Sequence, residues 1–314
     1  MGLVQRLPAL PDGFRVVEGE RGVMACREAH LEALLASGFS PDGRHRAGGT
    51  SELEDAAESG REPLGRLDLD GVACLARRFS HGGLARVVTG RRFKDPARPF
   101  DELNLSEALR DAGVPTPRVL AARAVRAFPR GFELTLVTER VSGTLDLGHL
   151  LGAVRRGELA AGDLRRALDS AGALVKLIHD AGCLHADLQP ANILLHEGCW
   201  GEAWILDLDR SRIEDGGGLR EAARVQNLAR LWRHVSRRER EYGPVVGVRG
   251  AIRFLRAYGV ASTDLRRWIG EIEDGAGKGG LLHGLGWWLE RTFGRSVDPR
   301  AAAGGPQPPR APRG

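Results

Sequence analysis

Four polar residues in one short stretch have the types and the spacing that phosphoryl transfer requires. His185, Asp187 and Asn192 form H-x-D-x-x-x-x-N, and Asp207 follows at the end of the next apolar run. Transfer to a hydroxyl needs a carboxylate beside the attacking oxygen, which we assign to Asp187. It also needs a neutral side-chain oxygen and a second carboxylate on magnesium, which we assign to Asn192 and Asp207. Residues 184–213 are therefore predicted to hold a catalytic loop and a metal-binding turn.

Two other interpretations of this stretch are open. Asp187 and Asp207 could be surface carboxylates that flank a hairpin, with His185 a hydrogen-bonded core histidine. Residues 207–209 could instead be the D-x-D metal motif of a nucleotide-sugar transferase, which leaves the spacing from His185 to Asn192 unexplained. The segments N-I-L-L and A-W-I-L-D read as two strands that hold Asn192 and Asp207 together. The agreement of these parts favours the phosphotransferase.

A helix predicted over residues 163–181 must deliver this loop. Asp163 suits its N-cap, Gly182 suits the position after its end, and apolar residues recur along one face between them. This apolar stripe is expected to be core.

The cation that grips the nucleotide phosphates is expected on a strand over residues 71–79. Arg77 or Arg78 could take that role, and a solvent-facing arginine is the plainer alternative. A helix is predicted over residues 95–112, and its Glu102 is the candidate ion-pair partner of Arg77, although a surface glutamate would be more common.

Two further segments could meet the nucleotide. Gly60 and Gly65 bound the segment GREPLG, where missing Cβ atoms would let backbone N–H groups approach phosphates, although a simple turn explains it nearly as well. A strand predicted over residues 132–141, next to one over 119–125, runs into a glycine turn, and backbone groups of Glu139 and Val141 are expected to meet adenine.

The rest of the chain divides by composition and periodicity. We expect a short helix over residues 23–35 and a flexible connection over 37–59. Further helices are expected over 219–235, 245–258, 264–273 and 281–293. The Pro-, Gly- and Arg-rich end at 299–314 is expected to be a disordered tail.

The composition of the 314 residues is that of a protein with a buried core: 42% are hydrophobic and 28% are charged. The net charge of +5 is compatible with phosphate-rich ligands, an anionic membrane surface or nucleic acid and selects none of them, and a solvated Arg-rich surface explains it equally well. There is no run of 18 apolar residues and no evident signal peptide, so we expect a cytoplasmic protein.

Together these motifs resemble the lipopolysaccharide core kinases that act on 3-deoxy-manno-octulosonic acid (Kdo) and heptose. The similar segments lie between about Gly60 and Val235. They are LARRFSHGG, FDELNLSEALRDAGVPTPRVLAA, LVTERVSG, HADLQPANILL, ILDLDRSRI and NLARLWR. Leu208 stands where the family has Phe, Gln189 stands where protein kinases have Lys, and the glycine loop is matched only in part.

The resemblance implies an α+β, two-lobed protein-kinase-like fold, with a small antiparallel-sheet N-lobe and a mainly helical C-lobe. The domains expected from it are an N-terminal extension and connection at residues 1–59, the N-lobe at 60–141, the C-lobe at 142–298 and the tail at 299–314.

The same resemblance implies ATP-dependent phosphorylation, with Mg2+, of a Kdo or heptose hydroxyl in the lipopolysaccharide inner core. Asp187 would be the base, Asn192 and Asp207 the metal ligands, and Arg77 with Glu102 the phosphate-gripping pair. The alternatives are a protein or other small-molecule kinase of this fold and a nucleotide-binding pseudokinase scaffold. The expected partner is the lipopolysaccharide core or Kdo-lipid A, with no nucleic acid. Peripheral contact with the cytoplasmic face of the inner membrane stays open, as does the oligomeric state.

The acceptor is expected to be neither a folded protein nor an extended peptide. The interval from Asp207 to the next helical pattern at Leu219 is short, and no A-P-E follows it. Arg210 and Arg212 in this interval, and the basic segment 80–92, could bind an anionic sugar. The simpler alternative is that these two arginines pair with nearby Glu214 and Asp215.

Overall fold

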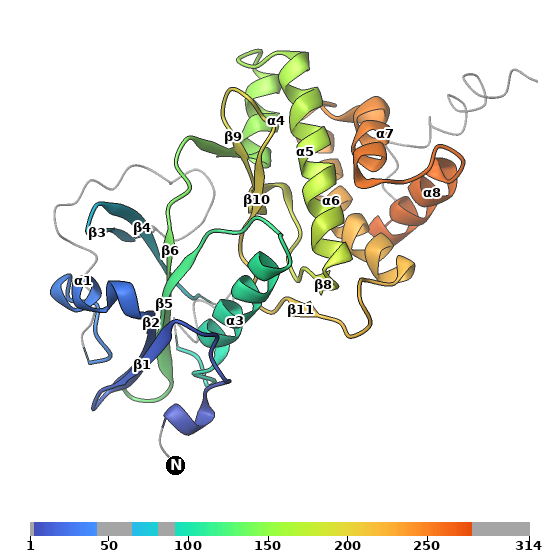
Figure 1. Ribbon diagram of the computed structural model, residues 1–314. Coiled ribbons are helices and arrows are strands. Elements are labelled where there is room, and N and C mark those ends of the chain that lie inside the picture. Colours follow the sequence, from blue (N-terminus) through green and yellow to red (C-terminus); the bar gives the residue numbers. More distant parts are fainter. Residues whose placement is uncertain (1–2, 43–64, 81–91, 278–314) are drawn as a thin grey trace, which may run out of the picture.

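The computed structural model describes residues 3–42, 65–80 and 92–277, which form two lobes (Figure 1). The smaller lobe is built on a six-stranded antiparallel sheet in the order β1-β2-β5-β6-β4-β3. Its strands are β1 (Phe14–Glu18), β2 (Gly22–Arg27), β3 (Gly65–Leu69), β4 (Val72–Arg78), β5 (Val119–Arg126) and β6 (Phe132–Glu139). The prediction of an α+β, two-lobed fold is confirmed.

Helices cover both faces of this sheet. The helix α3 (Arg98–Asp111) packs Phe100 and Leu103 against one face. The short α1 (Leu31–Ala36), with Leu34, and the following Phe39 pack against the other face. These buried apolar side chains hold β4 and α3 in one unit, which fixes the two elements that carry Arg77 and Glu102.

Residues 14–27 correct two predictions. Residues 22–27, expected to begin a helix over 23–35, form strand β2, and only Leu31–Ala36 of that range is α-helical. Residues 22–26 of β2 are buried, so the strand lacks the alternation that distinguishes a strand from a buried helix. Because β1 and β2 belong to the sheet, residues 14–27 are part of the N-lobe and not of an extension outside it.

The hairpin between β3 and β4 turns at Asp70-Gly71. Both residues have positive φ, 55° and 85°, and the Asp68 carboxylate accepts a hydrogen bond from the Gly71 N–H at 2.7 Å. Such an Asp-Gly pair is typical of a two-residue hairpin turn. Gly65 is the first residue of β3, and Gly60 lies outside the described residues.

The larger lobe is mainly helical. Its helices are α4 (Leu147–Arg155), α5 (Ala161–Asp180), α6 (Glu221–Tyr242), α7 (Gly247–Tyr258) and α8 (Leu265–Ala276). A short 3-10 helix, η3 (Pro190–Asn192), also belongs to this lobe. Two small sheets complete it: β7 (Thr144–Asp146), β9 (Ile193–His196) and β10 (Ala203–Ile205) form one, and β8 (Cys183–Leu184) with β11 (Arg212–Ile213) forms the other. Neither β7 nor α4 was expected from the sequence.

Helix α5 is central to this lobe and leads directly to the catalytic loop. Its buried face joins one continuous apolar core with α6, α7 and α8. A Cβ at Gly172 would lie 2.5 Å from the Phe254 carbonyl, so glycine is needed where α5 and α7 approach closely. The helix begins two residues before the predicted Asp163, which lies at the third position and accepts the Ala160 N–H at 2.9 Å.

Among the described helices, we find none with the length and the apolar run that crossing a bilayer requires. The expected helix at 281–293, the tail at 299–314 and most of the connection at 37–59 lie outside the described residues.

Candidate active site

The catalytic loop between β8 and η3 is built around a buried histidine. His185 is 1% exposed, and its Nε2–H donates to the Leu206 carbonyl at 2.9 Å. Its Nδ1 accepts the Asp187 N–H at 3.1 Å, so the ring is the neutral tautomer with its proton on Nε2. Burial lowers the pKa of His185. The imidazole therefore fixes the loop backbone against the strand end before Asp207.

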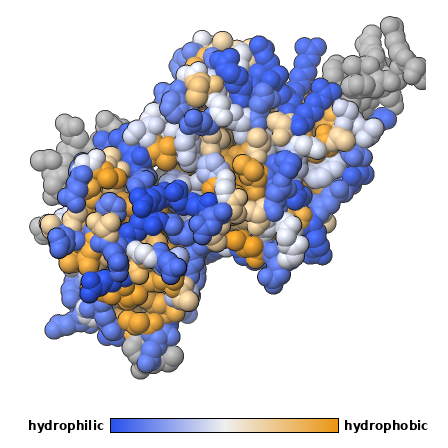
Figure 2. Space-filling model, viewed as in Figure 1, coloured by the Kyte–Doolittle hydropathy of each residue, from blue (hydrophilic) through white to orange (hydrophobic). Residues whose placement is uncertain are grey.

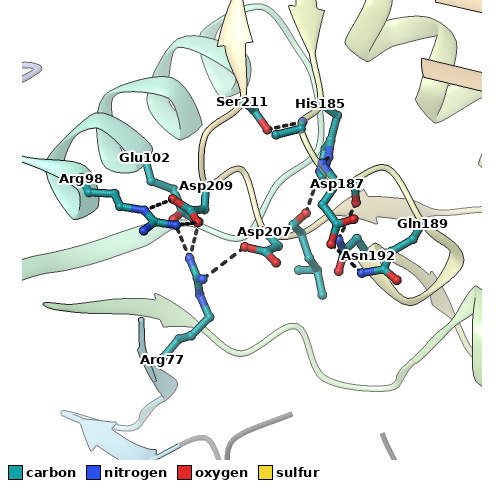
Figure 3. Close-up of polar contacts among 12 residues, drawn as sticks. Arg77, Arg98, Glu102, His185, Asp187, Gln189, Asn192, Asp207, Asp209 and Ser211 are labelled. Atoms are coloured by element: carbon teal, nitrogen blue, oxygen red, sulfur yellow. Dashed lines mark hydrogen bonds and ion pairs between the residues drawn. The ribbon is translucent and has the colours of Figure 1, made fainter. Parts of the chain in front are cut away.

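Two amide side chains hold Asp187. Gln189 donates from Nε2 to Asp187 Oδ2 at 2.7 Å, and Asn192 donates from Nδ2 to the Asp187 carbonyl at 2.8 Å (Figure 3). Asn192 is fully buried. The Gln189 contact orients the carboxylate, which is a role that the sequence alone did not indicate.

The antiparallel pairing of β9 with β10 brings Asn192 and Asp207 together. Ile193 lies opposite Ile205, and the Leu206 N–H donates to the Asn192 carbonyl at 2.8 Å. Asp207 then has φ of 60°, a left-handed conformation that is uncommon for a residue other than glycine. This turn directs its carboxylate toward the boundary between the lobes (Figure 3).

Arg77 joins three elements at this boundary. Its Nη2 lies 2.6 and 2.5 Å from the two carboxylate oxygens of Glu102 on α3, and its Nη1 lies 3.1 Å from Asp207 Oδ1 (Figure 3). The structure thus makes the Arg77–Glu102 ion pair that the sequence predicted, and the adjacent Arg78 is exposed. Burial raises the pKa of Glu102 to about 7, against the opposing effect of the Arg77 guanidinium.

A second arginine fork was not anticipated. Arg98, the first residue of α3, binds Asp209 through both nitrogens Nε and Nη2, with the Nε–Oδ1 distance 2.6 Å. Its guanidinium also lies over the Phe93 ring, 4.8 Å from the centroid. Because Asp209 is engaged by Arg98, residues 207–209 do not present two carboxylates to one metal, and the D-x-D alternative loses support.

The segment expected to meet adenine has part of its backbone already hydrogen-bonded. The Glu139 N–H donates to the Arg118 carbonyl at 2.9 Å, and the Val141 carbonyl accepts from the Thr144 hydroxyl at 2.9 Å. Within the part of the chain that the structure describes, the Val141 N–H makes no backbone hydrogen bond. The Val141 N–H is thus a donor that a nucleotide base could use.

The other predicted cations differ in their surroundings. Arg212 pairs with Glu214 at 3.2 Å, as the simpler alternative proposed, whereas Arg210 is exposed and has φ of 59°. Of the basic segment 80–92, only Ser80 and Arg92 are described. Figure 2 shows hydrophilic residues along the boundary between the lobes on the face in view, as expected of a site for charged ligands.

Comparison with known proteins adds independent information. The sequence model of the family described as "Lipopolysaccharide kinase (Kdo/WaaP) family" matches residues 76–258. A 3-deoxy-D-manno-octulosonic acid kinase of Stenotrophomonas maltophilia is 30% identical over 215 residues, which cover 67% of this chain and 81% of that protein. One of Actinobacillus succinogenes with the same name is 31% identical over 175 residues, 54% of this chain and 68% of that protein.

Among solved structures, "WaaP in complex with acyl carrier protein" is 22% identical and has a TM-score of 0.46, covering 76% of this chain and 86% of that one. The family match from 76 to 258 contains Arg77, Glu102, Asp187, Asn192 and Asp207.

Proposed function

Because the chain belongs to the lipopolysaccharide kinase (Kdo/WaaP) family, we propose that it transfers the terminal phosphate of ATP to a hydroxyl of Kdo in the lipopolysaccharide inner core. Its family makes it a kinase of a lipopolysaccharide sugar, and the choice of Kdo follows the name of its relatives. The cytoplasm, where ATP is available, is the proposed location.

One observation carries this proposal: Arg77 lies between Glu102 and Asp207, and the residue before Asp207 is hydrogen-bonded to His185 on the loop that holds Asp187. A guanidinium held by a buried carboxylate beside a metal-binding aspartate has the geometry needed to fix nucleotide phosphates. Three elements distant in sequence meet to form it. A solvent-facing arginine or a surface glutamate would not produce such an arrangement.

The residues present suit Mg2+. In the described part of the chain, no group of three or more His, Cys, Asp or Glu side chains could hold a metal ion. Magnesium commonly takes one or two protein oxygen ligands and completes its shell with phosphates and water. We assign the two protein ligands to Asn192, whose amide is oriented by its Nδ2 hydrogen bond to the Asp187 carbonyl, and to Asp207. When bound, the ion would neutralise charge on the phosphates.

Asp187 is proposed as the base that accepts the proton of the attacking hydroxyl. Gln189 holds one of its oxygens, and the His185 ring receives its backbone N–H. The Gln189 contact restrains the carboxylate and the His185 contact restrains the backbone that carries it, which favours in-line attack by a positioned oxygen. His185 is proposed to be structural, because both of its ring nitrogens are engaged with backbone.

The nucleotide base is proposed to lie against residues 139–141. The Val141 N–H would donate to the base, and the carbonyl of Glu139 would accept from it, since the Glu139 N–H is already used by Arg118. Gly65, at the start of β3, is proposed to lie near the phosphates at the edge of the sheet formed by β3 and β4.

The experiment that tests this function is transfer of labelled phosphate from ATP to Kdo-bearing lipid A, with a generic protein and an aminoglycoside as parallel acceptors. We expect Mg2+-dependent transfer to the saccharide alone. The Asp187→Asn variant is the matched control, since it keeps the size of the side chain. Efficient labelling of the protein acceptor, with none of the saccharide, would contradict the proposal.

A further inference from the structure

A cavity of about 280 Å³ lies between helices α4 and α6, outside the residues assigned to catalysis. Its wall includes the side chains of His149, Arg155, Arg238, Glu239 and Tyr242. Nothing in the proposed transfer reaction uses these residues. The cavity combines the guanidinium groups of Arg155, Arg156 and Arg238 with an aromatic ring and a carboxylate, which is an unusual lining for a purely structural gap between helices.

Two of these arginines, Arg238 and Arg155, are held in place by neutral partners. Arg238 donates from Nη1 to the Gly148 carbonyl at 2.7 Å, and a Cβ at position 148 would lie 2.6 Å from that nitrogen. The Arg155 guanidinium lies over the Tyr242 ring, 4.5 Å from its centroid. Among the described residues, neither Arg155 nor Arg238 forms an ion pair with a carboxylate, so both keep donors for an external anion, whereas Arg156 in the same wall pairs with Glu158.

Glu239 fixes one wall of the same cavity. It is 5% exposed, and its Oε1 accepts the backbone N–H groups of Val245, Val246 and Gly247 at 2.9, 2.6 and 3.1 Å. Its other oxygen, Oε2, is buried and has no hydrogen-bond partner in the described chain. Glu239 therefore holds the chain that follows α6 against the pocket, and the open donors of the pocket are those of the arginines.

Helix α6 connects this cavity to the catalytic loop. Asn227 donates from Nδ2 to the His185 carbonyl at 2.8 Å, which fixes one face of α6 against the loop. Residues at helical spacing from Asn227 share this face, and they include Arg230, His234 and Arg238. Burial lowers the pKa of His234, and the charge of Asp187 opposes that shift.

The cavity lies farther along α6 than the loop that holds Asp187. Arg238 is eleven residues beyond Asn227, about 16 Å along the helix axis. Helix α4, which forms the opposite wall, also packs on η3, the turn that ends in Asn192. A saccharide whose reacting hydroxyl lies at Asp187 would have to extend by about 16 Å, the length of several linked sugars, to reach the cavity.

We propose that the α4–α6 pocket binds a second anionic group, a phosphate or carboxylate, of the same saccharide that is phosphorylated at Asp187. Arg155 and Arg238 would hold the anion. The face of Arg230 and His234 would lie along the sugars between the two sites. This inference rests on the proposed function, because it assigns a specificity site for that acceptor.

The test compares three acceptors with the full-length protein: Kdo-bearing lipid A with its phosphates, the same molecule after enzymatic removal of those phosphates, and the phosphorylated molecule with its Kdo carboxylate converted to a methyl ester. We expect Arg155→Ala to raise the KM of the full acceptor about tenfold, as loss of a charge-assisted hydrogen bond would. The kcat and the KM of ATP should not change. One modified acceptor lacks the anionic group that the pocket binds, and its KM should be the same for Arg155→Ala and for the wild type. That result identifies the group as a phosphate or the carboxylate.

Arg256→Ala is the matched control, because it removes an exposed arginine from α7 in the same lobe. Two results would overturn the pocket while the proposed function stands. One is a wild-type KM that is equal for all three acceptors, and the other is an Arg155→Ala variant that behaves like Arg256→Ala. If the wild type transfers phosphate to none of the three, the proposed function fails, and the pocket assignment fails with it.

Discussion

Replacing Arg77 by alanine would leave the Glu102 carboxylate buried against α3 without its cation. Glu102 is 6% exposed, and breaking a buried pair on one side usually destabilises a protein by about 3–5 kcal/mol. Arg77 itself is 30% exposed, so solvent screens part of the interaction, and we take the low end, about 3 kcal/mol.

The loss of stability in Arg77→Ala should depend on pH, and the direction of this dependence follows from the raised pKa of Glu102. Burial already places this pKa at about 7 with Arg77 present, and Arg77 opposes the rise. Without Arg77 the pKa of Glu102 must rise further. At pH 6 the Glu102 carboxyl of the variant is then neutral and needs no cation. At pH 8 folding must either bury the unpaired charge or bind a proton, and both cost free energy. Arg77→Ala should therefore destabilise the protein more at pH 8 than at pH 6.

Equilibrium unfolding in urea, at both pH values, measures this effect. The double variant Arg77→Ala, Glu102→Gln should recover most of the lost stability at pH 8, because no buried charge is left unpaired, although its kinase activity should stay low. The reasoning is refuted if the single variant loses the same free energy at both pH values, or if Glu102→Gln brings no recovery.

Three further outcomes are expected. Asp187→Asn should lower kcat by about 10²–10⁴-fold with little change in nucleotide affinity, as measured by steady-state kinetics and titration with ATP, and near-normal turnover would remove Asp187 from the mechanism. Asp207→Ala should abolish Mg2+-dependent nucleotide binding, whereas Asp209→Ala should leave measurable binding; the reverse result would restore the D-x-D interpretation. His179 has a pKa of about 4 in the fold, chiefly because burial lowers it from 6.5. Its contribution to the free energy of unfolding, about 3 kcal/mol, should be complete above pH 6.5 and be lost as the pH falls toward 4. Urea unfolding of His179→Gln should show a weaker decline over that range.

The parts of the site that could be predicted from the sequence are those whose spacing is set within one short segment. His185, Asp187 and Asn192 lie on one loop, and the hairpin that brings Asp207 beside Asn192 is formed by adjacent strands. The Arg77–Glu102 pair could also be predicted, because a strand that carries a cation is followed by a helix with Glu102 in its first turns. Because successive side chains point to opposite faces of a strand, only one of Arg77 and Arg78 can point toward α3, and the sequence pattern does not decide which.

The missed features depend on contacts between distant segments. Arg98 and Asp209 are 111 positions apart, and neither residue carries a local signal for the other. The strand at 22–27 has no alternating pattern because residues 22–26 are all buried, and one of its two neighbours in the sheet, β5, begins only at Val119. The segment GREPLG predicts a turn at residues 60–65, whereas Gly65 already belongs to β3 and the turn before β4 is formed by Asp70 and Gly71. An Asp-Gly pair is a two-residue signal for a hairpin turn.

The two arginine forks suggest why an arginine suits the position that protein kinases give to lysine. One guanidinium reaches Glu102 on α3 and Asp207 on the metal turn at the same time, which a single ammonium on a flexible chain does less well. Phosphates would compete with Asp207 for Arg77, because both are anions. The second fork, from Arg98 to Asp209, does not involve the proposed metal ligand. It can therefore keep the metal turn against α3 while Arg77 exchanges its carboxylate partner for phosphate, so that nucleotide binding and the position of the turn need not change together.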